Sequence, residues 1–369
     1  MPVNDKIFYT DYNTLRNAVS QILGQGSATF GYGQLVQSST VSGANGSGPV
    51  LGGGTGANRI RTDEYTRLRS DIINVFRHIY GTDPTPADPI IGQLVRWVVS
   101  ASAVTSEYDV SEYNIAEYNS SSIAGSSDPY TQFSVIITDI QNNRFTCATS
   151  QSIVENKGSA ARSSPWGGGV ATIGVRARIN WSNSDQARYF FNSGGEIRIT
   201  STRTGGSATS QNTAWTNLLN GAATRTFSAQ LPVGTFGLAD GSNWYNLTNT
   251  YQNWYSLTDS SPYGLNQYRI QARTLDGAVV NNVSGTSAGL DILVLFQDNY
   301  RDPDDIANTS TPPGRTAPDD SVDGNLTVTV TAKRASGVLV PEPGTGNFTI
   351  QTPTVTLTSY NTGVSGLID

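Results

Sequence analysis

Cysteine and histidine are almost absent from this sequence of 369 residues, which contains one of each. A single cysteine excludes an internal disulfide, and a single histidine excludes a metal site built from several imidazoles. His78 lies late in an amphipathic segment, where a positive charge is favourable near a helix C-terminus, and we do not expect it in a Ser-His-Asp triad. Cys147 follows the strand-like Arg144-Phe145-Thr146 and is predicted to be a small buried side chain.

Charge is also scarce, because only 14% of the residues are charged. The net charge of -6 and the sequence pI of about 4.9 argue against a nucleic-acid partner, which would call for a basic face. No segment has the apolar length needed to cross a bilayer, and residues 1–6 lack the basic start and apolar run of a signal peptide. We therefore expect no membrane partner and a chain that stays soluble in the cytoplasm where it is made.

What the sequence has in abundance is Gly, Ser, Thr and Asn, together with 17 Tyr, 11 Phe and 6 Trp. The small polar residues are typical of a chain with many turns and short strands. The aromatic residues provide enough apolar area to build a core, which argues against a disordered chain.

Residues 1–82 are predicted to form an N-terminal helical hairpin that docks on a neighbour. Two segments, about 10–23 and 62–80, repeat apolar residues at helical spacing and end at Gly24 and Gly81. The stretch between them, Gln37 to Asn58, is rich in glycine and is therefore predicted to be a flexible loop. It lacks the P-loop pattern, so we do not expect it to bind phosphate. The predicted apolar faces consist of Tyr12, Leu15, Val19 and Ile22, and of Tyr65, Leu68, Ile72, Val75 and Ile79.

Residues 83–129 are predicted to be a linker or arm, which begins at a proline-rich break, Asp83 to Pro89. Residues 130–369 are predicted to form an antiparallel β-sandwich of the jelly-roll or immunoglobulin-like kind, so the fold class is mainly β. The βα alternation of a parallel sheet is missing. Period-two alternation or short apolar runs predict strands at 133–137, 170–179, 196–200, 267–273, 292–296, 326–332 and 354–358.

Two carboxylates, Glu196 and Asp291, are the candidates for a glycosidase-type pair. Both stand at predicted strand starts, which are ordinary positions for solvated acids. The acidic segment 302–323 could hold Ca²⁺, although its spacing matches no EF-hand and turn-forming Asp explains it equally well. The sequence therefore predicts no enzyme, and it assigns no catalytic residue, cofactor-binding residue or metal ligand.

The stretch 244–268 is predicted to be a long aromatic connection. Its rings could stack on sugars, or they could pack in a core or in an interface between subunits. Core or interface packing is the simpler interpretation. The aromatic residues concerned are Trp244, Tyr245, Trp254, Tyr255 and Tyr263.

Two groups of motifs resemble virion structural proteins of T4-like cyanophages and related marine phages. The opening is similar through residues 7–16, 31–34 and 68–74. The middle third is similar through Ala187-Arg188-Tyr189-Phe190-Phe191-Asn192-Ser193-Gly194-Gly195-Glu196-Ile197-Arg198, with 212–215 and 261–264. The glycine-rich insert at 43–56 departs from that pattern and puts close equivalence of the helical loop in doubt.

The resemblance implies a structural component of a tailed-phage virion, in the tail, baseplate, fibre or neck apparatus. Its expected partners are copies of itself and other virion proteins, assembled in the host cytoplasm, and the expected location is the virion. Two alternatives remain open: a receptor-binding adhesin that grips host glycan through 244–268, and a capsid decoration protein.

Overall fold

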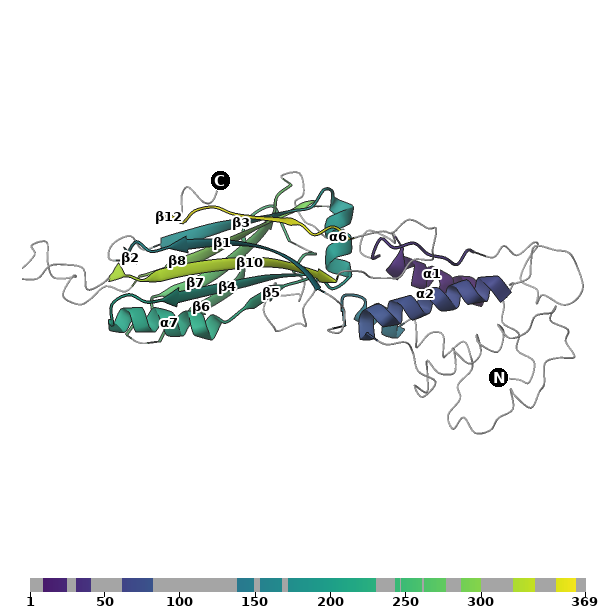
Figure 1. Cartoon of the computed structure of the whole chain (residues 1–369), viewed down its shortest axis with the longest axis horizontal. Helices are drawn as coiled ribbons and strands as arrows, with labels where there is room; N and C mark the ends of the chain where they lie inside the picture. Colours follow the sequence, from purple (N-terminus) through teal and green to yellow (C-terminus); the bar gives the residue numbers. More distant parts are fainter. Residues whose placement is uncertain are drawn as a thin grey trace, which may run out of the picture. The chain divides into compact units, whose positions relative to one another are not determined.

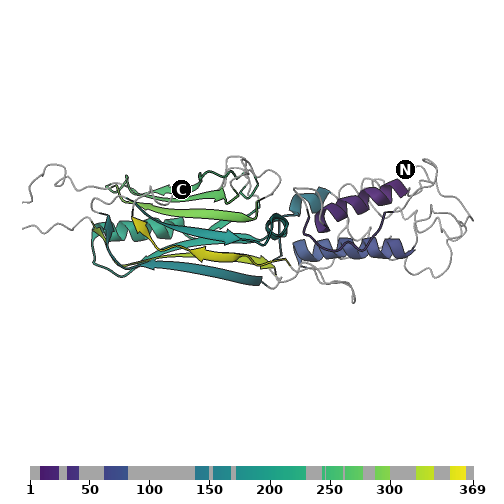
Figure 2. The same ribbon diagram turned by 90° about the horizontal axis from the view of Figure 1, so that it is seen from above.

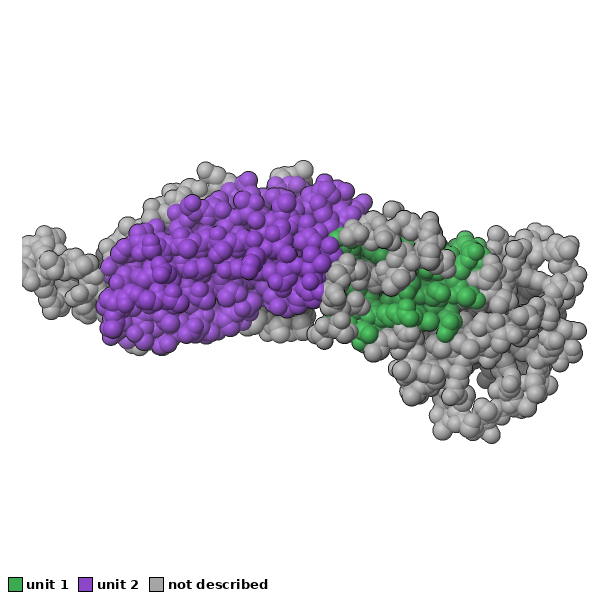
Figure 3. Space-filling model, viewed as in Figure 1, with its two compact units in different colours: residues 1–152, 337–350 green, residues 153–336, 351–369 purple. Residues whose placement is uncertain are grey.

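The computed structural model of the chain (Figure 1) divides into two compact units, which Figure 3 colours separately. One unit contains Met1–Ser152 and Gly337–Ile350, and the other contains Ile153–Ser336 and Gln351–Asp369. Most of the glycine-rich loop, the predicted arm at 83–129, the predicted strand at 133–137 and residues 301–320 lie outside the described residues. The structure describes residues 9–24, 31–40, 62–81, 138–148, 153–167, 172–229, 243–245, 247–260, 262–276, 287–299, 321–335 and 350–362.

The first unit contains two long helices, α1 (Tyr9–Leu23) and α2 (Thr62–Tyr80), at the places where apolar periodicity predicted helices. Gly81 takes a φ of 79°, the left-handed conformation in which glycine commonly ends a helix. Tyr12 Oη donates to the backbone oxygen of Glu64 at 3.3 Å, so the two helices are in contact. The predicted apolar faces are buried at Tyr12, Leu15, Val19 and Ile22 and at Leu68, Ile72, Val75 and Ile79.

A buried carboxylate attaches residues 31–40 to helix α2. Asp71 accepts hydrogen bonds from Gln37 N at 3.0 Å, from Ser38 N at 2.9 Å and from Ser38 Oγ at 2.6 Å. Burial raises the pKa of Asp71, and the bonds from Ser38 and Gln37 oppose that rise. Asp71 therefore satisfies backbone N–H groups of a segment that is neither helix nor strand.

His78 lies in the last turn of α2, as the sequence predicted, whereas Cys147 differs from its prediction. His78 is fully buried, and its ring centroid lies 4.8 Å from that of Tyr32, so it packs in the core of the first unit. Residues 138–143 are helical, 144–145 form a turn, and 146–148 form neither helix nor strand. Cys147 is half-buried there, so the predicted buried strand position is wrong.

The second unit is built from antiparallel sheets, which confirms the mainly β prediction. A four-stranded sheet has the order β1 (Ile153–Arg162), β10 (Asn325–Ala335), β4 (Glu196–Thr204) and β5 (Arg225–Phe227). A six-stranded sheet has the order β11 (Thr354–Leu357), β3 (Thr172–Asn180), β8 (Gly289–Gln297), β7 (Gln267–Thr274) and β6 (Gln252–Thr258), and β12 (Asn361–Thr362) also pairs with β3. A small sheet joins β2 (Trp166–Gly167) to β9 (Ser321–Val322).

The two larger sheets lie in layers in Figure 2, and side chains connect them. Ser201 Oγ of β4 and Tyr268 Oη of β7 are 2.9 Å apart in a buried hydrogen bond. A Cβ added to Gly158 of β1 would lie 2.6 Å from Leu357 Cδ1 of β11, so glycine permits a close approach there. The alternation predicted the inward residues correctly, because Ile173, Val175, Ala177, Ile179, Ile197, Ile199, Val328, Val330 and Ala332 are all fully buried.

Two helices in the second unit were not predicted: α6 (Ser184–Asn192) and α7 (Ser210–Ala222). Each has a side-chain cap, since Asn183 accepts from Gln186 N and Thr209 accepts from Asn212 N. These caps are the local signal that could have located them. None of the described helices is long and apolar enough to span a membrane.

Candidate functional site on the outer face of the six-stranded sheet

The two carboxylates proposed as a hydrolytic pair lie on different sheets. Glu196 is on β4 and forms an exposed ion pair with Arg198 at 3.0 Å. Asp291 is on β8 and is fully buried, so the predicted solvated strand end is wrong for Asp291. The structure gives these acids separate structural partners.

Asp291 is the centre of a buried ionic cluster. Its carboxylate accepts from Arg176 Nε at 2.8 and 2.7 Å and from Arg273 Nε at 3.1 Å, and it also forms an ion pair with Arg176 Nη2. Tyr251 Oη donates to Asp291 Oδ2 at 2.9 Å. Burial and the neighbouring Asp291 charge raise the pKa of Tyr251, which therefore stays a hydrogen-bond donor. One carboxylate thus serves two guanidinium groups.

The cluster belongs to a larger cationic surface on one face of the sheet. Every second side chain of a strand lies on the same face. On β8, Asp291, Leu293 and Leu295 share the face opposite to the core residues of that strand, and Tyr251 packs against the two leucines. The strand registers place two arginines on each side of these residues: Arg176 and Arg178 from β3, and Arg269 and Arg273 from β7. We call these four arginines with Asp291 the arginine face.

Two of these arginines have no acidic partner. Neither Arg178 nor Arg269 forms a hydrogen bond or ion pair with any other residue that the structure describes, and Arg269 Nε is buried without a hydrogen-bond partner. Arg178 is exposed, and Arg269 is half-buried. The arginine face therefore carries a net positive charge, although the whole chain is acidic.

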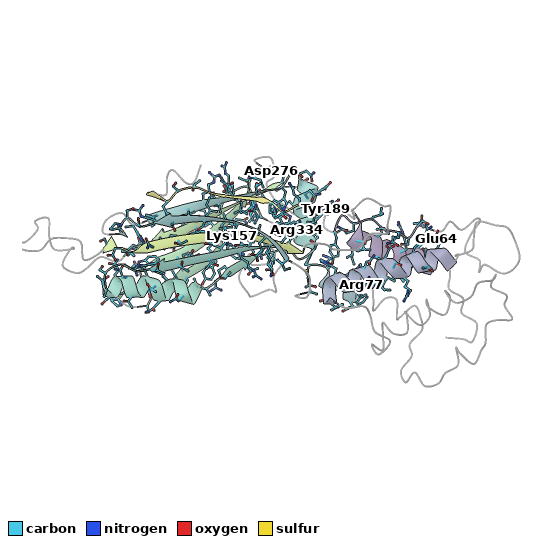
Figure 4. All side chains as sticks on the ribbon, viewed as in Figure 1. Glu64, Arg77, Lys157, Tyr189, Asp276 and Arg334 are labelled. Atoms are coloured by element: carbon cyan, nitrogen blue, oxygen red, sulfur yellow. The ribbon has the colours of Figure 1, made fainter. Side chains whose placement is uncertain are left out.

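The outer face of the four-stranded sheet has a smaller excess of positive charge, with three cations and two anions in its two charged rows. The register places Lys333 of β10 between Glu155 of β1 and Glu196 of β4. Lys157 of β1, labelled in Figure 4, is in the same row as Arg198 of β4. Opposite charges in adjacent strands stabilise a sheet locally. The larger excess of positive charge therefore lies on the outer face of the six-stranded sheet.

Asp323 is the described end of the acidic segment considered for calcium. Its carboxylate accepts from Ser207 N at 3.1 and 3.0 Å, from Ser207 Oγ at 2.9 Å, and from Asn212 Nδ2. Arg203 Nη2 lies 3.3 Å away. These bonds join the loop before α7 to the turn before β10. Among the described residues no group of His, Cys, Asp and Glu is arranged to hold a metal ion.

Replacing Asp323 with asparagine should reduce stability in a pH-dependent way. The bonds from Ser207 lower the pKa of Asp323, so its stabilising effect is present above the usual value of 3.8 and is lost as the pH falls through the lowered value. Thermal unfolding of wild type and D323N should differ at neutral pH and converge in acid. The exposed Asp185, changed to asparagine, is the control; an equal difference at both pH values would contradict the assignment.

The aromatic residues of 244–268 are mostly core residues. The exposed fraction is 0% for Trp244, 8% for Tyr245, 3% for Trp254 and 6% for Tyr255, and only Tyr263 is half-buried. Strand β6 passes through this stretch, so it is not only a connection. The core-packing interpretation is confirmed for these four rings, and the exposure that sugar stacking requires is contradicted.

Sequence reasoning missed the arginine face, although the signal was present. The alternation that places Val175 and Ala177 in the core also places Arg176 and Arg178 on the opposite face. The burial of Asp291 could not be predicted, because it depends on Arg176 of β3, Arg273 of β7 and Tyr251, which precedes β6. No protein-family model, curated protein or solved structure matches this chain.

Proposed function

We propose that the chain is a structural component of a tailed-phage virion, in the tail, baseplate, fibre or neck apparatus, and acts by assembling with copies of itself and neighbouring virion proteins. We further propose that the two larger sheets form a β-sandwich of the jelly-roll or immunoglobulin-like kind. Helices α1 and α2 would belong to an N-terminal helical hairpin. The motif resemblance at 187–198 first suggested this class of protein.

The observation that carries the proposal is that three aspartate side chains form hydrogen bonds or ion pairs within the protein. Asp71 holds backbone N–H groups, Asp291 holds two arginines, and Asp323 holds a loop against α7. Each carboxylate is occupied by fixed intramolecular partners, which suits a rigid building block better than a reactive site. An enzyme would need acids or nucleophiles that converge on a substrate, and the proposed pair Glu196 and Asp291 is divided between sheets.

The adhesin alternative has little structural support, because four of the five rings proposed to grip glycan are buried. A capsid decoration protein would share the same architecture and differ only in its place on the particle. The deciding experiment is therefore to locate the chain in the particle.

The test is detection of the full chain in gradient-purified particles of the phage that encodes it, followed by immunogold labelling. We expect the protein to sediment with the particles and the label to gather at the tail, baseplate, fibre or neck. Label distributed over the capsid would support the decoration alternative. Absence of the protein from purified particles would contradict the proposed function.

A further inference from the structure

We infer that the arginine face is a docking surface for the acidic segment 302–320 of a second copy of this chain. This inference rests on the proposed self-assembly and names the surfaces that carry it. The segment contains Asp302, Asp304, Asp305, Asp319 and Asp320, with Arg315 as its single basic residue.

Charge is the first argument. The whole chain has a net charge of -6, yet the arginine face combines four arginines with one aspartate. The rest of the chain is therefore more acidic than the whole, so a second copy is attracted to this face. Such fields steer association when the charges lie within a Debye length, about 8–10 Å at physiological salt.

The geometry of the arginines is the second argument. Asp291 already accepts hydrogen bonds from some of the N–H groups of Arg176 and Arg273, and these ion pairs hold the two arginine side chains on the sheet surface. Arg178 and Arg269 form no bond with the described residues, so their guanidinium groups are available for carboxylates. Arginine suits this function because its planar group binds a carboxylate with two parallel hydrogen bonds.

The floor of the face is the third argument. Leu293 and Leu295 are fully buried on the outer side of the sheet, with Tyr251 packed against them. Because these leucines are already covered, an incoming segment would contact the arginine side chains and not the leucines, and the apolar layer beneath the arginines strengthens those ionic contacts. The four-stranded sheet has no equivalent apolar floor, because its outward rows consist mainly of threonines and charged residues.

The two surfaces are different parts of the chain, so the contact is heterologous. A heterologous contact repeats from one copy to the next and closes into a ring or continues as a filament. Rings and filaments are the assemblies from which tails and necks are built, and the inferred contact is consistent with that role. A twofold dimer would require a self-complementary surface instead.

The test is sedimentation velocity of the full chain at about 0.1 M and about 1 M salt, over which the Debye length falls from about 10 Å to about 3 Å. We expect the wild type to self-associate at the lower salt and to dissociate at the higher. The double change R178E and R269E should weaken association about tenfold or more. It alters no bond among the described residues, and circular dichroism will verify that the sheet remains folded.

A control reverses the same number of charges on the other sheet, through K157E and R198E; because R198E also breaks the exposed ion pair with Glu196, circular dichroism will verify the fold of this variant too. This control should associate like the wild type. The decisive variant combines R178E and R269E with D304K and D305K, because exchanging both signs should restore the association that each pair of changes removes.

Three outcomes would overturn the inference. One is a wild type that stays monomeric at low salt. Another is an oligomer that R178E and R269E leave unchanged, which would leave particle incorporation, and with it the proposed function, intact. The third is a gel shift of duplex DNA that depends on Arg178 and Arg269, which would identify a nucleic acid as the occupant.

Discussion

Replacing Asp291 with alanine should lower the free energy of unfolding of the second unit by about 3–5 kcal/mol. The carboxylate is fully buried, and the side chains of Arg176 and Arg273 are only 14% and 17% exposed. Its removal leaves two guanidinium groups close together with no counter-charge and deprives Tyr251 Oη of its acceptor. The loss should appear in urea unfolding followed by tryptophan fluorescence, since five of the six tryptophans belong to this unit.

Glu196→Ala is the matched control for Asp291→Ala. Glu196 also pairs with an arginine on a strand, but that pair is substantially exposed, and such pairs contribute about 0–1 kcal/mol. Replacing Arg176, Arg273 and Asp291 together with apolar residues should recover part of the lost stability, because no uncompensated charge remains. A loss below about 1 kcal/mol for Asp291→Ala would show that the cluster is not a structural centre.

The strands that could be predicted are those in which one face is apolar. In β3, β7 and β10 the buried and exposed residues alternate, and the alternation alone located each strand and its inward face. Strand β1 was missed because Ile153–Arg162 contains few large apolar residues, and its register with β10 provides its stability. Helices α6 and α7 were missed because short helices between strands depend on caps more than on periodicity.

The candidate site was harder to predict than the fold, because its residues are far apart in the sequence. These residues meet only when β3, β8 and β7 pair in register and the residue before β6 lies beside them: Arg176, Asp291, Arg273 and Tyr251. A carboxylate at a strand start is usually solvated, and the only local feature that distinguishes Asp291 from Glu196 is the uninterrupted apolar run 292–296 that follows it. The residues that bury Asp291 are brought to it by strand pairing and are not its neighbours in the sequence.

Replacing Trp244 with alanine should destabilise the second unit by about 3–5 kcal/mol, a typical loss for a large buried aromatic residue. The ring is fully buried and stacks on Phe191 with centroids 4.7 Å apart, and it lies 5.7 Å from Trp181. Phe191 also contacts Phe190 and Phe227, so the cavity would open within a connected aromatic cluster. Urea unfolding and near-ultraviolet circular dichroism would measure the loss of stability and of ring order.

The same variant also separates the two interpretations of the aromatic stretch. Leu265, which is 65% exposed, is the control, and L265A should change stability by less than about 0.5 kcal/mol. If Trp244 gripped glycan, W244A would fold as stably as the wild type and lose only sugar binding. Because its ring contacts Trp181 and Phe191 inside the unit, we expect the opposite: a large loss of stability, arising from a residue that packs at the centre of an aromatic cluster.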